Sequence, residues 1–278
     1  MRYPFKILLA ISGIARSTYR FYINKKDIDI KNQDIINIIK DIFYAHKKRY
    51  GYRRITLELK KQGLNINHKK VLRLMNKLKL HSITHKKRKY SSYKGEIGKI
   101  ADNHIKRNFE ANRPNEKWFT DVTEFNLRGS KLYLSPILDA YGRYIVSYNV
   151  SSTPNSYQII DMLTQAFKTN SNIKNLILHS DQGWQYQHKF YTKRLGEKRV
   201  IQSMSRKGNS LDNGLIESFF GIMKSEMFYG QENSYKTIEE LKSAIAEYID
   251  YYNTKRIKLK LKGLTPMQYR NQSLLTNT

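Results

Sequence analysis

The order of apolar patterns after residue 118 constrains the fold more than any other feature of the chain. Segments with a strand-like pattern lie at 118–125, 131–138, 143–150, 176–178 and 199–203. Segments with helical spacing lie at 156–167, at 187–196 and from about residue 213 onward. The first three strands predict an antiparallel meander, in which Asp139 caps a turn, and the nearly all-apolar 176–178 is typical of a buried parallel strand. The order βββαβαβα therefore predicts an α/β fold, a mixed sheet with helices packed on its faces.

The first part of the chain predicts a small helical domain. Helical spacing covers 34–43, a second helix follows Tyr50-Gly51-Tyr52, and Asn67 can cap a third. The third helix has an apolar stripe, and its other face carries Lys69, Lys70, Arg73 and Lys77. Three short helices that end in a basic one are the pattern of a helix-turn-helix DNA reader. A small helical bundle with a solvated basic face is the alternative, because runs of charge alone are weak signals.

Charge is spread unevenly along the chain. The 278 residues include 51 Lys and Arg against 23 Asp and Glu, a net charge of +28. Residues 1–117 hold 30 of these basic residues and only 9 of the acidic ones. Such an excess needs a polyanionic partner, and nucleic acid is the commonest. Residues 1–117 are therefore expected to bind the polyanion electrostatically. The basic stretch 81–112 is interpreted as a tether or as an arm that lies along phosphates.

Other classes of protein are disfavoured by what the sequence lacks. No stretch approaches the roughly 20 apolar residues of a membrane-spanning helix, so no membrane partner is expected. The first residues imitate a secretion signal, but Ser12-Gly13 interrupts the apolar run and basic residues resume at Arg16. The absence of cysteine excludes disulfides and cysteine-based zinc sites, and it is compatible with a reducing cytoplasm.

Three carboxylates occupy positions that the predicted sheet would bring together. Asp121 lies within the first strand, Asp181 directly follows the buried strand, and Glu217 lies on the late helix. Ligand sites of open α/β sheets form at the carboxyl ends of strands. On its helix, Glu217 shares a polar line with Asn213 and Lys224, opposite the apolar face, so Lys224 is expected to contact a phosphate.

Clustered carboxylates predict a metal site, although each residue also has a structural interpretation. Carboxylates repel one another unless cations lie between them, and oxygen-only ligation suits Mg²⁺ and Mn²⁺. Two such ions about 3.5–4 Å apart can activate an attacking oxygen and stabilise a leaving one at a phosphodiester. Asp181 could equally be a turn residue and Glu217 a surface helix residue, whereas strand interiors disfavour aspartate, so Asp121 argues for a role. Taken singly, each is more often structural than catalytic.

Three motifs around these carboxylates resemble those of the retroviral-integrase-like transposases of bacterial insertion sequences. The motifs read WFTDVTEF at 118–125, LHSDQGWQY at 178–186 and DNGLIESFF at 212–220. Between Asp181 and Glu217 lie 35 residues, the spacing for which this superfamily of acidic-triad transposases is named. The segments YGYRRI at 50–55 and HKKV at 68–71 resemble the helix-turn-helix of the same proteins.

The resemblance implies a ribonuclease H-like mixed five-stranded sheet with flanking helices, preceded by a small all-helical helix-turn-helix domain. It implies that Asp121, Asp181 and Glu217 hold two Mg²⁺ ions, with Mn²⁺ as a substitute, and catalyse DNA strand cleavage and strand transfer. His179 and Asn213 are candidates to support the site or to face the substrate, and a structural role is an equal alternative for each. DNA contacts are expected at Lys224, Lys69, Lys70, Arg73, Arg53 and Arg54.

The closing segment also resembles the family, with one departure. It includes Arg256 and the run LTPMQY at 264–269, but Lys258 stands where many relatives have a histidine. Interpretation of this segment is therefore limited to DNA contact or helix packing. The chain starts where many relatives begin a second reading frame, which implies a possible upstream-frame partner protein. Double-stranded DNA, self-association on DNA and a nucleoid-associated, cytoplasmic location are further implications.

The expected domains are an N-terminal segment (1–30), the helix-turn-helix domain (31–80), a basic linker (81–112), the catalytic core (113–228) and a C-terminal helical extension (229–278). Alternatives from other classes remain open. The chain could be a catalytically inactive DNA-binding protein or repressor derived from a transposase, although an intact triad argues against this. It could also be a nuclease that cuts without joining, or a structural nucleoid protein, which would explain the charge but not the motifs.

Overall fold

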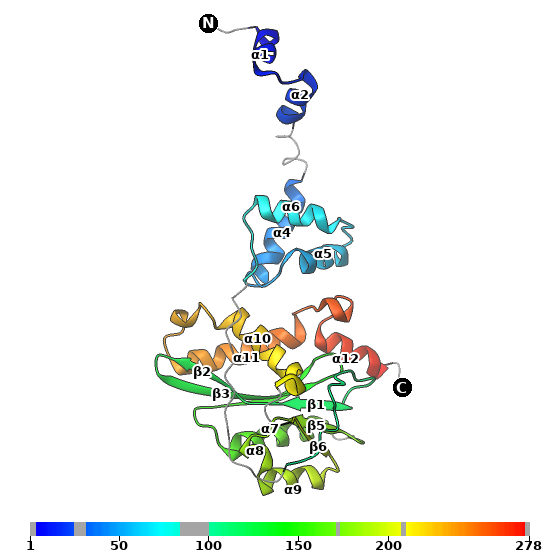
Figure 1. Cartoon of the computed structure of the whole chain (residues 1–278), viewed down its shortest axis with the longest axis vertical. Helices are drawn as coiled ribbons and strands as arrows, with labels where there is room; N and C mark the ends of the chain where they lie inside the picture. The colour runs from blue at the N-terminus through cyan, green and yellow to red at the C-terminus, as the bar shows by residue number, and fades with distance from the viewer. Residues whose placement is uncertain (1–3, 25–31, 84–99, 171–172, 207–209, 276–278) are drawn as a thin grey trace. The chain divides into compact units, whose positions relative to one another are not determined.

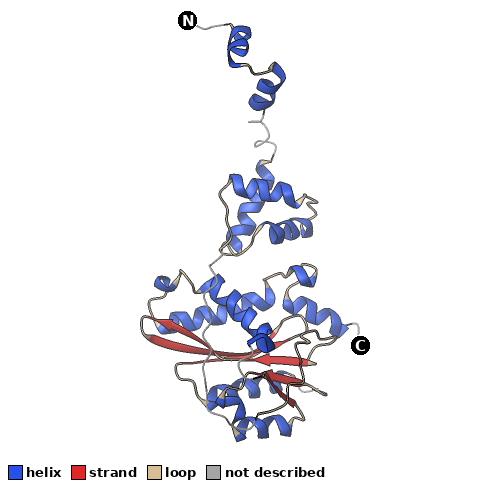
Figure 2. Cartoon of the chain, viewed as in Figure 1, coloured by secondary structure: helices blue, strands red, loops and turns tan. Residues whose placement is uncertain are grey.

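The computed structural model of the chain describes residues 4–24, 32–83, 100–170, 173–206 and 210–275 (Figure 1). The chain divides into two compact units, Met1–Ser82 and Ile83–Thr278. The described part of the first unit contains helices, whereas the second combines a sheet with helices (Figure 2). Residues 84–99, which belong to the predicted basic linker, lie outside the described residues.

The first unit contains the predicted three-helix arrangement. Its helices are α1 (Phe5–Ser12), α2 (Arg16–Asn24), α4 (Gln33–Ala45), α5 (Tyr52–Lys61) and α6 (His68–Lys77). Helices α4, α5 and α6 surround buried apolar side chains that include Ile39, Phe43, Ile55, Leu59 and Val71. The predicted cap is confirmed, because the Asn67 side chain accepts a hydrogen bond from the backbone N–H of Lys69 at 2.8 Å.

The second unit is built on a mixed sheet. Its strands are β1 (Lys117–Thr120), β2 (Thr123–Leu127), β3 (Ser130–Asp139), β4 (Ile145–Ser151), β5 (Ile177–Ser180) and β6 (Ile201–Met204). Strand β3 pairs antiparallel with β1, β2 and β4. Strand β5 lies parallel to β1 on one side and to β6 on the other. The predicted antiparallel meander, followed by a buried parallel strand, is confirmed.

The first predicted strand, 118–125, is divided in two, which gives six strands in the described sheet instead of the expected five. Both pieces pair with the same partner in one register, Thr120 with Ile137 and Thr123 with Leu134. Continuing that register places Asp121 opposite Pro136, and proline has no N–H to donate to a ladder. Because β1 and β2 share one line along β3, the sheet still has five strand positions across its width.

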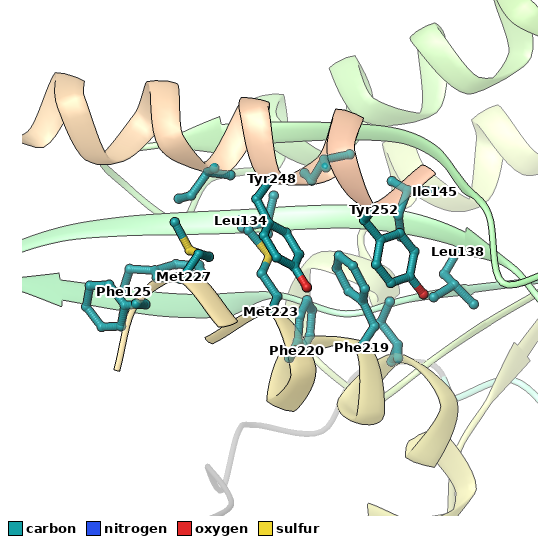
Figure 3. Close-up of a cluster of buried hydrophobic side chains, with 14 of the residues drawn as sticks. Phe125, Leu134, Leu138, Ile145, Phe219, Phe220, Met223, Met227, Tyr248 and Tyr252 are labelled. Carbon is teal, nitrogen blue, oxygen red and sulfur yellow. The ribbon is translucent and has the colours of Figure 1, made fainter. Parts of the chain in front are cut away.

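Two apolar cores lie on opposite faces of the sheet. On one face, α10 (Gly214–Met227) and α11 (Ile238–Thr254) pack onto β1–β4. Figure 3 shows this core, in which Phe219 and Met223 of α10 meet Tyr248 and Tyr252 of α11 against the strands. The other face is covered by α7 (Ser156–Thr169), α8 (Trp184–Gln187) and α9 (Lys189–Glu197). The result is the helix–sheet–helix layering visible in Figure 1.

The remaining described helices of this unit are short 3-10 helices and the C-terminal α12, which packs on the end of the sheet. Short 3-10 helices lie at Ser210–Asn213, Glu232–Ser234 and Leu259–Leu261, and α12 spans Pro266–Leu275. Arg270 of α12 pairs with the buried carboxylate of Asp139 at the end of β3. Asp139 also accepts a hydrogen bond from the backbone N–H of Tyr141 at 3.0 Å, so its predicted role as a turn cap is confirmed.

Candidate active site

Asp121 and Asp181 lie next to each other at the ends of neighbouring parallel strands. The pairing of β1 with β5 sets Phe119 opposite His179. Continued by two residues, this register sets Asp121 opposite Asp181, each one residue beyond the end of its strand. The backbone N–H of Val122 donates to Oδ1 of Asp121 at 2.7 Å, and that of Gly183 donates to Oδ1 of Asp181 at 2.9 Å. Each carboxylate is thus oriented by a backbone N–H one or two residues further along the chain.

Glu217 lies on α10, the helix that packs with α11 on one face of the sheet. It lies in the first turn of α10 and is half-buried. The apolar side of α10, which includes Ile216 and Phe219, packs in the same core as Phe119 of β1. A Cβ atom added at Gly221, one turn further along α10, would meet no other atom within 4 Å, so open space borders the helix there.

The three carboxylates interact electrostatically. Burial raises the pKa of Asp121 well above its ordinary value, and the negative charges of Asp181 and Glu217 raise it further. Burial also raises the pKa of Asp181, and burial followed by the charge of Asp181 raises the pKa of Glu217. All three shifts favour the neutral carboxylic acid, which means that burial and mutual repulsion outweigh the positive charge that the described residues bring to the cluster.

Lys224 supplies a positive charge that acts on Asp121. Its ammonium nitrogen Nζ donates to the backbone carbonyl oxygen of Glu124 at 2.6 Å and lies 5.0 Å from the centre of the Phe125 ring. Burial lowers the pKa of Lys224 to about 8, although the charges of Glu124 and Asp121 act in the opposite direction. Lys224 therefore lies beside the carboxylates without neutralising them.

The two supporting candidates have different surroundings. His179 is fully buried, and its Nδ1 lies 2.9 Å from the hydroxyl oxygen of Ser203 on β6. Burial lowers the pKa of His179 to about 4, so the ring is neutral at physiological pH. Asn213, directly before α10, is also buried, and its side-chain oxygen and nitrogen find no hydrogen-bond partner among the residues that the structure describes. A buried amide without a partner is unusual and suits a group that contacts something else.

The candidate ligands can be compared with what divalent metal ions require. Within the described ranges, no three carboxylate or imidazole groups are close enough to enclose an ion as they stand. The chemistry of Asp121, Asp181 and Glu217 nevertheless fits Mg²⁺ or Mn²⁺, because all the candidate ligands are carboxylate oxygens. Their raised pKa values fit as well, since an added cation would relieve the repulsion that raises them.

Comparison with known proteins decides the family. Two family models described as integrase core domain match residues 111–210 and 217–274, and one described as HTH-like domain matches residues 30–88. InsK for insertion sequence element IS150 of Escherichia coli (strain K12) is 49% identical over 98% of this chain and 95% of its own length. The transposase for insertion sequence element IS904 of Lactococcus lactis subsp. lactis (strain IL1403) is 34% identical over 83% of this chain and 91% of its own length. This chain belongs to the insertion-sequence transposases.

The transposase also has the fold of a viral integrase assembly chain. A chain in the cryo-EM structure of the simian T-cell lymphotropic virus intasome, in complex with PP2A regulatory subunit B56 gamma, matches with a TM-score of 0.51. The match covers 84% of the transposase and 74% of that chain, at 16% sequence identity. Together with the mixed sheet and its flanking helices, this confirms the predicted fold class. No helix in the described part of the transposase is long and apolar enough to cross a membrane.

The basic residues proposed for DNA contact in the first unit are at its surface. Lys69 and Arg73 of α6 are exposed, and Lys70 between them is partly covered. Arg53 on α5 is exposed and donates from Nε to the hydroxyl oxygen of Tyr52 at 3.1 Å. Arg54 is less exposed and donates to the backbone oxygen of Arg49 at 3.3 Å. Lys69, Arg73 and Arg53 are therefore more accessible to a phosphate backbone than Lys70 and Arg54.

The closing segment packs through a buried ion pair. The Arg256 guanidinium donates to both carboxylate oxygens of Glu226 on α10, at 2.8 and 2.6 Å. Tyr248 of α11 donates to the same carboxylate at 3.0 Å. Arg256 is only 2% exposed, which favours helix packing over DNA contact as the role of this arginine.

Sequence reasoning missed one charged group close to the site, Asp212. Its carboxylate is completely buried and is bound by two arginines, Arg107 and Arg206. Asp212 lies within the third motif, but no local pattern distinguishes a buried aspartate from an ordinary helix-start residue. Its partners come from other parts of the chain, so only the fold reveals them.

Proposed function

We propose that this transposase cleaves DNA strands at the ends of an insertion element and transfers them to target DNA, in a reaction that depends on two divalent metal ions. The observation that carries the proposal is the matched placement of Asp121 and Asp181 beyond β1 and β5, with Glu217 on α10 in electrostatic contact with both. Two carboxylates at the carboxyl ends of neighbouring strands and a third on the adjacent helix, in an insertion-sequence transposase, support a two-metal phosphodiester site.

In this proposal Asp121, Asp181 and Glu217 are the metal ligands. When bound, two Mg²⁺ ions would supply activation of the attacking oxygen and stabilisation of the leaving one at a DNA phosphate. The backbone N–H groups of Val122 and Gly183, just after β1 and β5, orient the two aspartates. Because the strands are rigid elements held by pairing on both sides, they fix the ligands more precisely than loops would.

Lys224 and the basic residues of the first unit position the DNA in this proposal. Lys224 can release the carbonyl oxygen of Glu124 and donate to a phosphate near the carboxylates, since its hydrogen bond is to an uncharged acceptor. In the first unit, the exposed basic face of α6 would hold the duplex, and Lys69 and Arg73 are its accessible residues. His179, neutral and fully buried, is a support for β5 rather than a proton donor.

The test is a cleavage assay on a labelled duplex that carries the DNA bordering the element. Wild type would be compared with Glu217→Gln in Mg²⁺, in Mn²⁺ and in EDTA. Glu239→Gln is the matched control, because Glu239 is an exposed glutamate in the first turn of α11. We expect metal-dependent nicking and joining in wild type and in Glu239→Gln, with a loss of at least about 1000-fold in Glu217→Gln. Mn²⁺ titration followed by electron paramagnetic resonance would measure ligand loss independently of activity.

A second candidate, a catalytically inactive DNA-binding protein, predicts different results. It would bind the duplex without cleaving it in any metal, and Glu217→Gln would change neither DNA binding nor Mn²⁺ binding. Cleavage that survives Glu217→Gln would contradict the assignment of the site. If cleavage appears only after the upstream-frame protein of the element is added, that protein is a required partner. Mass measurement of the DNA complex would test the further expectation that the transposase acts as a homo-oligomer.

A further inference from the structure

Asp212 has a set of hydrogen bonds that the proposed reaction does not use. It has no exposed surface. Its Oδ2 accepts from Nε of Arg206 at 2.8 Å, from the backbone N–H of Arg206 at 3.1 Å and from the Asn103 amide at 3.0 Å. Its Oδ1 accepts from Nη2 of Arg206 at 2.9 Å and from Nε of Arg107 at 3.1 Å. These donors lower the pKa of Asp212 far below its ordinary range, chiefly through Arg206.

The donors come from segments that are anchored to the sheet. Arg206 lies two residues after β6, which ends at Met204. Asn103 and Arg107 belong to a segment that runs along β6 before the chain enters β1. Within it, the backbone N–H of His104 donates to the Ser203 hydroxyl oxygen at 2.9 Å. The backbone N–H of Met204 donates in turn to the carbonyl oxygen of Asp102 at 3.3 Å.

Asp212 is also connected to both elements that carry the candidate ligands. It lies in the 3-10 turn Ser210–Asn213, which leads directly into α10. Asp212 itself is five residues before Glu217 in the chain. The Ser203 hydroxyl that accepts from His104 also bonds the His179 ring at 2.9 Å. His179 lies on β5 two residues before Asp181, and the charge of Asp212 acts on its ring.

We propose that Asp212 is a positioning residue. Its hydrogen bonds with Arg206, Arg107 and Asn103, here called the clasp, fix the start of α10. The clasp thereby sets where Glu217 lies relative to Asp121 and Asp181. The inference rests on the proposed function, because it assumes that the place of Glu217 matters for metal binding. The residues that hold the clasp are not ligands themselves. They act through the turn Ser210–Asn213.

A role in positioning explains why the clasp is ionic. A buried charge that gains ion pairs loses its hydration, so such pairs are weak sources of stability compared with apolar packing. The side chains of Arg107 and Arg206 remain 47% and 59% exposed, so only the carboxylate is fully dehydrated. Five hydrogen bonds from two segments fix the positions of the two carboxylate oxygens, which is the support that a metal ligand on a helix start requires. A misplacement of about 1 Å can cost roughly 100-fold in rate.

The test compares Asp212→Asn with Asp139→Asn in the full chain. Asp139 is the matched control, because it is another fully buried aspartate that an arginine, Arg270, binds, and it lies away from α10. Hydrogen–deuterium exchange would be followed in peptides covering 210–217 and 219–227. We expect Asp212→Asn to speed exchange in 210–217 and to leave 219–227 near wild type. Asp139→Asn should lower the melting temperature without this local change.

Metal binding and cleavage complete the test. We expect Asp212→Asn to weaken Mn²⁺ binding about tenfold and to slow cleavage at saturating metal about 100-fold, with the affinity for DNA within twofold of wild type. Unchanged exchange in 210–217, or Mn²⁺ affinity equal to wild type, would overturn the positioning role. Wild type and Glu217→Gln are measured alongside. If these two proteins bind Mn²⁺ equally, the proposed function fails. If they differ and Asp212→Asn binds Mn²⁺ like wild type, only the positioning role of Asp212 fails.

Discussion

Lys224 donates from its ammonium nitrogen to the backbone carbonyl oxygen of Glu124 at 2.6 Å, three residues along the chain from Asp121. The bond holds the ammonium in a partly covered position, and this burial lowers the pKa of Lys224 to about 8. Ordinary lysines keep their charge to about pH 10. The lysine proposed to contact a phosphate therefore loses its proton within the range accessible to DNA-binding experiments.

Binding of element-end DNA should weaken as pH rises through 8. Lys224 is protonated and charged below that value, and the neutral amine above it gives no charge-assisted hydrogen bond to phosphate. Between pH 7 and pH 9, we expect wild type to lose about tenfold more affinity than Lys224→Arg, since arginine stays charged. Fluorescence anisotropy at fixed ionic strength measures this. Parallel pH curves for the two proteins would count against a Lys224–phosphate contact.

Asp121→Asn should stabilise the metal-free protein at pH 7. The folded state raises the pKa of Asp121, so it retains this proton where the unfolded chain has lost it. The stabilising contribution of the protonated form is therefore present at low pH and is lost as pH rises from about 4 through the folded-state pKa. Asparagine imitates the neutral acid at every pH. We expect a melting temperature higher by roughly 2–4 °C for each kcal/mol gained, measured by circular dichroism in EDTA.

The pH dependence of that difference provides the control. The gap between Asp121→Asn and wild type should shrink as pH falls toward 4, because wild type then becomes protonated. Added Mg²⁺ should raise the melting temperature of wild type more than that of the variant, since a ligand that binds only the folded state stabilises it. A gap that is constant from pH 4 to pH 8 would contradict the raised pKa.

Arg256→Ala should destabilise the second unit without a direct effect on DNA contact. Removing one partner of a buried ion pair leaves the other charge uncompensated and costs about 3–5 kcal/mol. In this protein Glu226 would be left buried. Thermal unfolding measures the loss, and Lys260→Ala, at an exposed position of the same segment, is the control. Recovery of stability in the double variant Arg256→Met with Glu226→Leu would identify the lost charge balance as the cause.

DNA binding by the helix-turn-helix domain should weaken with salt, and substitution of individual basic residues should reduce that dependence. Each phosphate contact contributes about 0.9 to the slope of log affinity against log salt. We expect Lys69→Ala and Arg73→Ala each to reduce that slope by about 1. Lys61→Ala is the control, because Lys61 on α5 is already paired with Glu58 at 3.3 Å. Slopes equal to wild type in both test variants would place the DNA elsewhere.

Local patterns in the sequence were sufficient to predict most of the sheet and the placement of two carboxylates on it. The position of Asp181 follows from a short apolar strand and the residue after its end, both of which can be read within a few residues. The division of the first strand at Asp121 was not predictable from that strand alone. It coincides with Pro136, which lies opposite Asp121 only once β3 has paired.

Charged residues were harder to interpret because their partners are remote in sequence. The basic run that includes Arg256 suggested DNA contact or packing, and burial against Glu226 favours packing. The ion pairs of Asp212 were not predictable, because Arg107 lies 105 positions earlier in the chain. Periodicity reveals which face of an element is apolar, but it contains no information on which charges will be buried together.

The segment that precedes β1 covers the outer edge of β6, where Met204 donates to the carbonyl oxygen of Asp102. An uncovered edge strand offers unpaired backbone groups to other chains and promotes aggregation. A recombinant fragment begun at residue 113 would lack this cover together with two of the donors to Asp212. A fragment begun at residue 100 would retain both. For crystallisation or inhibitor screening of an isolated catalytic fragment, we expect the thirteen residues 100–112 to reduce self-association.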